Sequence, residues 1–194
     1  MKKNVWPWLI LAILVSLITI IFGQKLYQQR RLAHLYVNVS GSQAEIFLDE
    51  QKLGLAPIKD WTAEAGFYQL KIVTDNYTYS TSIRLSPRTA TIIDWQTAST
   101  VEQSSGLTYE LVPSSEEQSQ KTQLTIQTIP DRALLALSHS RQTEFTPYQT
   151  DELLIGNYQA EISLPGYNNL SFPFSLTNGY QLKITAKLAQ AAQE

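Results

Sequence analysis

The sequence predicts an all-β protein in which two tandem small β-sandwich modules follow one transmembrane α-helix. Three observations predict this architecture: an apolar run near the N-terminus, an apolar–polar alternation with a period of two in the remainder, and a set of positions that recurs about ninety residues later. Chance rarely supplies four matches at one spacing, so we expect two copies of one module. The recurring positions at an offset of 90 are Pro57 with Pro147, Gly66 with Gly156, Tyr68 with Tyr158, and Tyr77 with Tyr167, and Ala44 recurs as Ala133 at an offset of 89.

The composition excludes several classes of function. The chain has 194 residues, a formal net charge of −2 and no cysteine. Phosphate binding needs a positive surface, so nucleic acid is not an expected partner. Without cysteine the chain forms no disulfide and no thiolate-ligated metal site, and it cannot carry the lipidated cysteine of a lipoprotein.

The N-terminal apolar run predicts a transmembrane helix over residues 5–23, after a short segment of residues 1–4. From Val5 to Phe22 a helix would span about 27 Å, which is enough for a hydrocarbon core. Trp6 and Trp8 stand at one end, where indole rings favour the membrane interface. The alternative is a cleaved signal peptide. Since the run is long for that role and no small-residue cleavage site follows it, we expect an uncleaved signal-anchor.

Basic residues flank the run on both sides, so their number does not decide its orientation. They are Lys2, Lys3, Lys25, Arg30 and Arg31. We expect the N-terminus in the cytoplasm, because the free amine adds positive charge there, and the C-terminal bulk outside the cell, because β-rich modules behind a lone N-terminal segment are commonly exported. Residues 24–33 contain helix formers and no breaker, and are expected to form a short stalk.

The first β-sandwich is expected over residues 34–112. Short alternating strands separated by turns every eight to twelve residues are typical of a sandwich or barrel. The expected strands are centred on residues 35–40, 44–48, 68–72, 77–85 and 89–95, with one extra strand over 107–112. Trp61 is placed in a loop between Pro57 and Gly66.

A polar linker is expected over residues 113–121, because this stretch has almost no aliphatic residues and cannot form a core. The second β-sandwich follows over residues 122–189, with a frayed tail over 190–194. Asn76 and Gly166 precede equivalent tyrosines, and both residue types accept positive φ at low cost. If Gly66 and Gly156 adopt positive φ, valine at either position should destabilise its module.

The order of these features resembles the PEGA domain, a small β-sandwich module of bacterial and archaeal envelope proteins. In the first copy the resemblance rests on Ala44, Phe47-Leu48-Asp49, Lys52, Gly54, Pro57, Gly66, Tyr68 and Tyr77. In the second copy it rests on Pro130, Ala133, Thr146, Pro147, Gly156, Tyr158, Gly166 and Tyr167. The chain departs from the family pattern at Glu50, Ala56 and Ala65, and the second copy lacks the Asp-Gly-Lys hairpin. The resemblance implies an anchored or surface protein without defined chemistry.

No catalytic, cofactor or metal site is expected. His34 and His139 fall in different modules without the spacing of metal ligands. Ser138-His139-Ser140 reads as a hairpin tip, since no Gly-x-Ser-x-Gly elbow is present. The neighbouring carboxylates at 116–117 and 151–152 read as solvated loop charge.

The aromatic residues offer the remaining candidate for a binding site. They are Trp61, Phe67, Tyr77, Tyr79, Trp95 and Tyr109, with Trp61 as the best single candidate for a ligand contact. Core packing is the competing interpretation, because aromatic side chains dominate small β-cores. The expected function is a non-catalytic, membrane-anchored scaffold that contacts envelope proteins. The alternative is a carbohydrate or cell-wall binding module, and an enzyme is a distant third.

Overall fold

The computed structural model describes residues 31–114, 122–138 and 143–192, and the all-β prediction is confirmed there. Every regular element in these ranges is a β-strand, and no helix among them is long and apolar enough to cross a bilayer. The predicted transmembrane helix over residues 5–23 lies outside the described residues, as do most of the stalk and linker.

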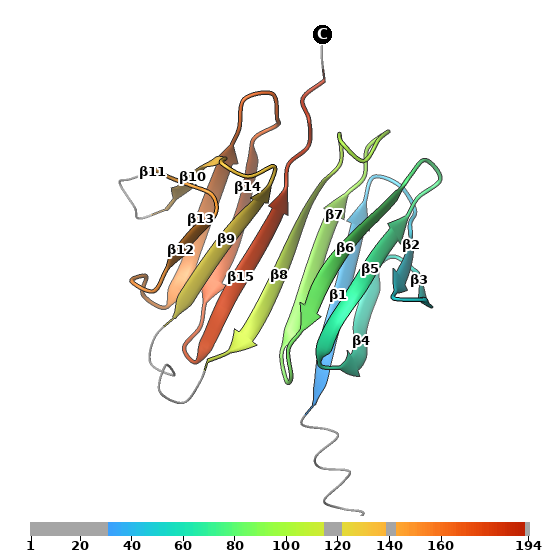
Figure 1. The fold of residues 1–194 in the computed structure, drawn as a ribbon, viewed down its shortest axis with the longest axis horizontal. Coiled ribbons are helices and arrows are strands. Elements are labelled where there is room, and N and C mark those ends of the chain that lie inside the picture. Colours follow the sequence, from blue (N-terminus) through green and yellow to red (C-terminus); the bar gives the residue numbers. More distant parts are fainter. Residues whose placement is uncertain (1–30, 115–121, 139–142, 193–194) are drawn as a thin grey trace, which may run out of the picture.

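A seven-stranded central sheet runs through the whole molecule (Figure 1). Its strands in spatial order are β12 (Tyr148–Thr150), β9 (Gln123–Ile129), β15 (Tyr180–Lys187), β8 (Ser105–Pro113), β7 (Ala90–Gln96), β1 (Leu32–Ser40) and β4 (Ile58–Glu64). β8 is the middle strand. It is antiparallel to both β7 and β15, whereas the pairs β1–β7 and β9–β15 are parallel.

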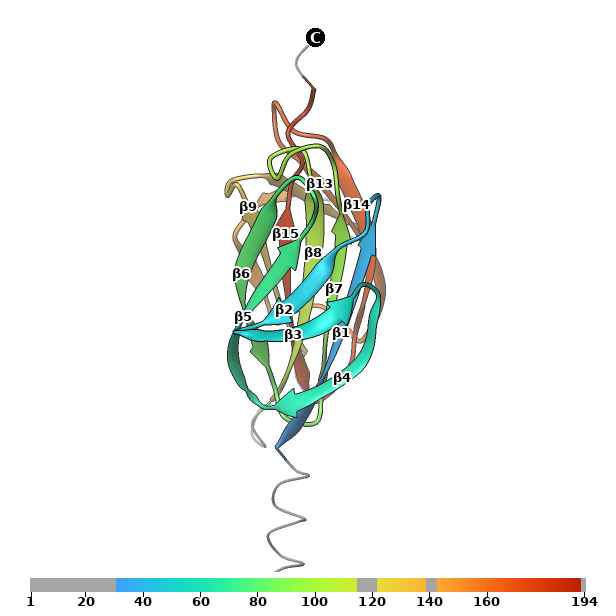
Figure 2. The ribbon, with the colours of Figure 1, turned by 90° about the vertical axis from the view of Figure 1, so that its right-hand side faces the viewer.

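Two four-stranded outer sheets complete the two copies. The first outer sheet consists of β3 (Gln51–Leu55), β2 (Glu45–Leu48), β5 (Gly66–Val73) and β6 (Thr78–Leu85). The second consists of β11 (Thr143–Phe145), β10 (Leu134–Leu137), β13 (Gly156–Ser163) and β14 (Leu170–Leu176). The end-on view of Figure 2 shows β3 beside β4, where the first outer sheet meets the edge of the central sheet.

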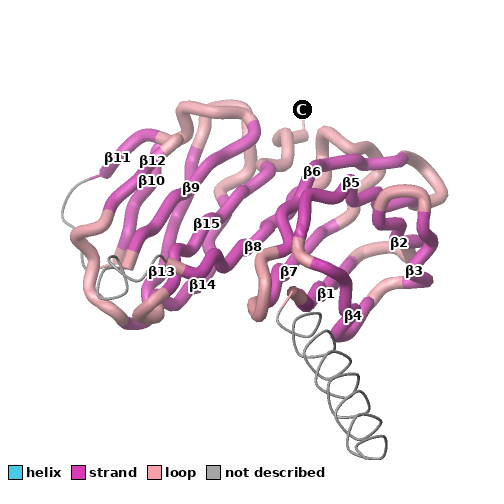
Figure 3. Tube along the Cα trace, turned by 60° about the horizontal axis from the view of Figure 1, so that its bottom comes forward, coloured by secondary structure: helices cyan, strands magenta, loops and turns pink. Residues whose placement is uncertain are grey.

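Each outer sheet covers its own hydrophobic core. The first core is built on Leu35, Ile46, Leu70, Ile72, Ile83 and Ile93. The second is built on Leu124, Ile126, Leu135, Ile162, Phe172 and Ile184. Alternate side chains of a strand point to opposite faces, so β8 presents Leu107, Tyr109 and Leu111 to the second core. On its other face, Gly106 lies opposite Trp95, which belongs to the first core. The outer sheets therefore lie on opposite faces of the central sheet (Figure 3).

The sequence predicted β8 as an extra strand of the first module, but in the structure the two copies share this strand. It pairs with β15 from Gly106 to Pro113, and with β7 from Ser105 to Glu110. The two copies thus form one continuous sheet. Sequence alternation places a strand's faces but does not say which strand lies on its other edge, so this pairing could not be predicted.

Matching hydrogen bonds recur in the two copies. The hydroxyl of Tyr68 donates to the carbonyl of Glu64, and that of Tyr158 to the carbonyl of Leu154, each at 2.8 Å. The amide of Gln69 donates to the side chain of Asp49 at 2.7 Å, and the amide of Gln159 to Ser138 at 2.8 Å. A serine therefore takes the place of the hairpin aspartate in the second copy.

Two predicted boundaries change. β1 begins at Leu32, because Leu32 and Ala33 pair with Glu64 and Ala63 of β4. The tail is hydrogen-bonded to the rest of the molecule as far as Ala191. The amide of Gln190 donates to the carbonyl of Glu102, and the amide of Ala191 donates to the carbonyl of Gly166.

The expectation that Asn76 and Gly166 share a left-handed turn was wrong, and the positive φ considered for Gly66 and Gly156 occurs at Gly156 alone. Positive φ occurs at Gly156 (+150°) and Gly166 (+82°), but not at Gly66 or Asn76. The turns before Tyr77 and Tyr167 therefore differ: in the first copy the hydroxyl of Thr74 accepts from the amide of Tyr77 at 3.1 Å.

Candidate functional site

Two grooves flank β8, one on each face of the central sheet. Because β7 and β15 run in the same direction on either side of β8, a two-fold rotation about an axis along β8 relates the two copies. Each outer sheet ends short of the neighbouring copy and leaves a groove beside its last strand. We call the groove beside β14 the apolar groove and the groove beside β6 the polar groove.

The apolar groove is floored by β7 and β8. Tyr109 lies opposite Ile92 on β7 and opposite Ile184 on β15, and Ile92 lies opposite Tyr36 on β1. This row starts in the second core at Ile184 and leads outward to Ile92, which is 40% exposed. Hydrophobic surface thus continues from a core onto an open sheet face, which is where docking sites are found.

The wall of the apolar groove comes from β14. Phe172 and Phe174 are buried in the second core, and Pro173 between them lies at the free edge. The groove has a volume of about 610 Å³ and also includes Leu107, Leu111 and Asp94. That volume falls within the range of ligand-binding clefts.

Tyr109 joins the floor to the wall. Its hydroxyl donates to the carbonyl of Pro173 at 3.5 Å, and its ring meets Phe172 edge-on with centroids 6.2 Å apart. Burial, with a smaller contribution from the nearby carboxylate of Asp94, raises the pKa of Tyr109 from 10.0 to about 12. The hydroxyl therefore remains a neutral donor at physiological pH.

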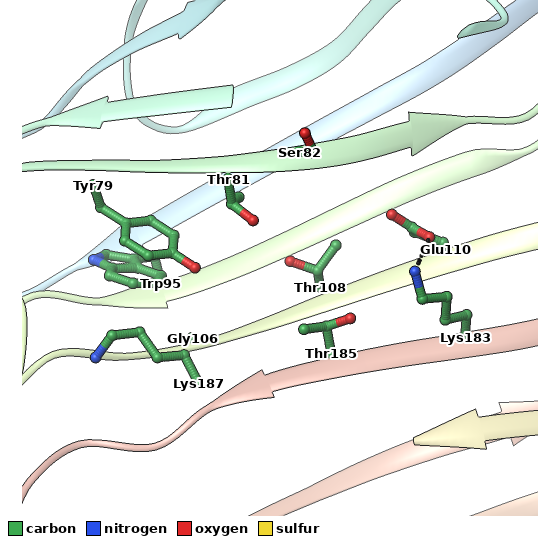
Figure 4. Close-up of a pocket in the computed structure, with 10 residues that line it drawn as sticks. All are labelled: Tyr79, Thr81, Ser82, Trp95, Gly106, Thr108, Glu110, Lys183, Thr185 and Lys187. Carbon is green, nitrogen blue, oxygen red and sulfur yellow. Dashed lines mark ion pairs between the residues drawn. The ribbon is translucent and has the colours of Figure 1, made fainter. Parts of the chain in front are cut away.

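The polar groove has a different lining (Figure 4). Tyr79 stacks on Trp95 with centroids 4.0 Å apart, and the Lys187 ammonium lies 5.7 Å from the Trp95 ring. The same ammonium donates to the carbonyl of Ser104 at 2.6 Å, and burial lowers the pKa of Lys187. The hollow itself measures only about 40 Å³, which is too small for a ligand-sized molecule.

Glu110 connects the two copies from the floor of the polar groove. Its side chain is 6% exposed and lies 3.4 Å from the Lys183 ammonium of β15, as drawn in Figure 4. Its other oxygen accepts the backbone amide of Arg84, from β6, at 3.0 Å. One buried carboxylate thus links β6, β8 and β15.

The six aromatic candidates do not gather into one patch. Trp61 lies in β4 rather than in a loop, and its partly buried ring packs against the first core. Phe67 is 77% exposed, with the Arg84 guanidinium 5.6 Å from its ring. Tyr77 accepts from the Trp95 indole at 3.2 Å, near the polar groove. Tyr109 belongs to the other face.

The loop assignment of Trp61 failed because a β-bulge interrupts the alternation of β4. Trp61 lies opposite Leu35, whereas Val37 lies opposite Ile58, so two residues of β4 face one residue of β1. Asp60, inside the bulge, has a φ of 57°. The bulge places two polar residues side by side, so the apolar–polar alternation is lost and the sequence of this segment is typical of a loop.

His34 and the other polar candidates remain apart. His34 hydrogen-bonds to Asp60, which also accepts from Tyr36 at 3.1 Å, and the His34 contact is the main cause that lowers the pKa of Asp60. Asp151 and Glu152 are exposed, and His139 lies outside the described residues. Within the described ranges, no three His, Cys, Asp or Glu side chains are grouped as metal ligands are.

Sequence reasoning missed Ile92 and Pro173. A signal for Ile92 was present, since the adjacent Ile92 and Ile93 place apolar side chains on both faces of one strand. Pro173 occupies an outward position of the strand whose inward residues are Phe172, Phe174 and Leu176. This placement is typical of an edge strand.

Comparison with known proteins supports the resemblance in the first copy. No curated protein and no solved structure is similar to the chain. The matched segment forms β1 to β7 and the first core, which is the first of the two copies in which the sequence predicted the resemblance. Residues 32–97 match the PEGA domain family.

Proposed function

We propose that this chain is a non-catalytic, single-pass membrane protein that displays two tandem PEGA-like modules outside the cell and binds a protein partner through the apolar groove. The observation that carries the binding role is the row from buried Ile184 through Tyr109 to exposed Ile92. The family match supports a PEGA-like first copy. The recurrence of its strand order and hydrogen bonds supports extending that description to the second copy.

The lining of the groove favours aliphatic or aromatic side chains of a protein partner. Its surface is mainly hydrocarbon from Ile92, Leu107 and Leu111, with few polar groups, including the Tyr109 hydroxyl and the Asp94 carboxylate. A polysaccharide would need an open aromatic face and many hydrogen-bonding groups. Trp61, the residue that favoured a carbohydrate function, is partly buried against the first core.

Crosslinking from the groove tests this proposal. A photoreactive amino acid replaces Ile92 in the full-length chain, in intact cells. The matched control places it at Ile129, which is 46% exposed on the opposite face of the same sheet. We expect a discrete protein adduct from position 92 alone, mapped by mass spectrometry to an apolar segment of the partner. Adding Tyr109→Lys to the same chain should abolish the adduct.

Two results would contradict the groove as a protein-binding site. One is an equal adduct pattern from positions 92 and 129, which would indicate random collision. The other is retention of the chain on cell-wall polysaccharide that Trp61→Leu abolishes and Ile92→Asp leaves unchanged, with folding of both variants checked by circular dichroism. That result would favour the carbohydrate-binding alternative.

Location has its own test. Because the chain has no cysteine, a single Asn178→Cys substitution at the exposed β14–β15 turn gives a unique label site. A membrane-impermeant maleimide should label it in intact cells, and the protein should sediment with membranes. Labelling only after lysis, or recovery of the intact chain in the soluble fraction, would end the proposed topology.

A further inference from the structure

The free edge of β6 is the second unused surface of the molecule. β6 ends the first outer sheet and pairs only with β5. The amide of Arg84 donates to Glu110, and its carbonyl accepts from the Thr91 hydroxyl at 2.9 Å, so the backbone polar groups of Arg84 point away from β5. Since these directions alternate along a strand, those of Ser82 and Ser80 point the same way. Both residues are exposed.

The equivalent edge of β14 is closed. Ser80 and Ser171 are equivalent, because each accepts from the side-chain amide of the matching glutamine, Gln69 or Gln159, at 2.7 and 2.8 Å. Two residues further on, Pro173 therefore takes the place of Ser82. Proline has no amide hydrogen, and its carbonyl here accepts the Tyr109 hydroxyl. Proline at an edge is a common protection against further strand pairing. The edge of β6 has Ser82 at this position and lacks that protection.

The floor beside β6 is polar and carries two ammonium groups against one carboxylate, Glu110. Lys183 and Lys187 lie four residues apart on one face of β15, which is about 13 Å along a strand. Thr185 lies between them, and Gly106 and Thr108 continue the floor on β8. Lys183 is already paired with Glu110. Lys187 donates to backbone carbonyls, that of Ser104 at 2.6 Å among them, and forms no ion pair with a carboxylate of the described residues. A strand added to β6 would lie over these groups.

We infer that β6 accepts an extended segment of a protein partner as an additional strand, with acidic side chains of that segment directed at Lys187 and Lys183. The backbone of Ser80 and Ser82 supplies the hydrogen bonds, and the lysines select for carboxylates. This surface is on the opposite face from the apolar groove, so either binding role can fail without the other.

A synthetic capped peptide, Thr-Asp-Val-Thr-Val-Asp-Thr, tests the inference against the full-length chain in mild detergent. Its two aspartates match the lysine spacing. We expect binding by fluorescence anisotropy, with slowed hydrogen exchange at the Ser80 and Ser82 amides. Ser82→Pro should weaken binding about tenfold, while Ser82→Ala, which keeps the amide, should not. Proline is already accommodated at the equivalent position of β14, so the variant should fold.

Charge is tested separately. Lys187→Gln should weaken binding several-fold, whereas Lys59→Gln, at an exposed position of β4, removes the same charge without effect. The inference is overturned if the lysine analogue of the peptide binds as well as the aspartate peptide. It is also overturned if Ser82→Pro leaves binding unchanged, or if the exchange protection falls outside β6.

Discussion

Trp95 packs directly on the backbone of Gly106 across the β7–β8 pair, where the two residues lie opposite each other. A β-carbon at position 106 would lie 2.2 Å from Cε3 of the indole. The same ring is 3% exposed, stacks on Tyr79 and receives the Lys187 ammonium on its face. The absence of a side chain at 106 therefore lets β8 lie against the first core and still pair with the second copy.

Gly106→Ala should be strongly destabilising. The methyl group cannot fit without moving Trp95, and overpacking of this kind costs about 1–3 kcal/mol in the free energy of unfolding. Ser105→Ala, one residue earlier, is the control and should change stability little. Adding Trp95→Leu to Gly106→Ala should recover part of the loss relative to the sum of the single variants. Chemical denaturation measures all four, and strict additivity would contradict the contact.

Removing the Glu110 side chain should cost more than removing an exposed carboxylate. Glu110→Ala leaves the amide of Arg84 and the ammonium of Lys183 without their partner, at a cost of about 1–3 kcal/mol. Glu45 forms the exposed comparison, since its pair with Lys52 spans 2.5 Å with both side chains over 40% exposed. Glu45→Ala should cost less than about 1 kcal/mol. Equal losses in denaturation experiments would show that burial of Glu110 does not matter.

Tyr109 should make stability fall at high pH. Its pKa of about 12 in the folded chain exceeds the ordinary 10.0, so the unfolded chain loses this proton first. Its contribution is fully present below pH 10 and is lost as pH rises toward about 12. The difference between wild type and Tyr109→Phe in tyrosinate absorbance should show one group titrating near that value. A difference titration centred near 10 would place Tyr109 in open solvent.

Substitution should distinguish Gly156 from Gly66. Gly156 has a φ of +150°, a conformation that other residues adopt only with strain, so Gly156→Ala should cost about 1–2 kcal/mol. Gly66 has no positive φ, and a β-carbon there would only touch the Tyr68 ring at 3.4 Å. Gly66→Ala should therefore change the melting temperature much less. Equal shifts for both glycines would contradict the difference in backbone conformation.

Much of the fold was predictable because apolar alternation marks buried strand faces directly. Leu35, Ile46 and Ile72 were assigned to inward positions from their spacing alone, and all three are buried. Trp61 was misplaced because the bulge at Asp60 breaks the alternation of β4. The grooves could not be predicted, since they depend on the pairing of β8 with β15, a long-range contact that no local pattern specifies.

Hydrogen exchange along β8 tests the continuous sheet most directly, and both grooves depend on that sheet. In an antiparallel strand successive amides point to opposite neighbours, so pairing on both edges protects every amide from residue 106 to residue 110. We predict uniformly slow exchange at these amides in the full-length chain. Fast exchange at every second amide would show that β8 pairs with one copy only, and would contradict the shared sheet.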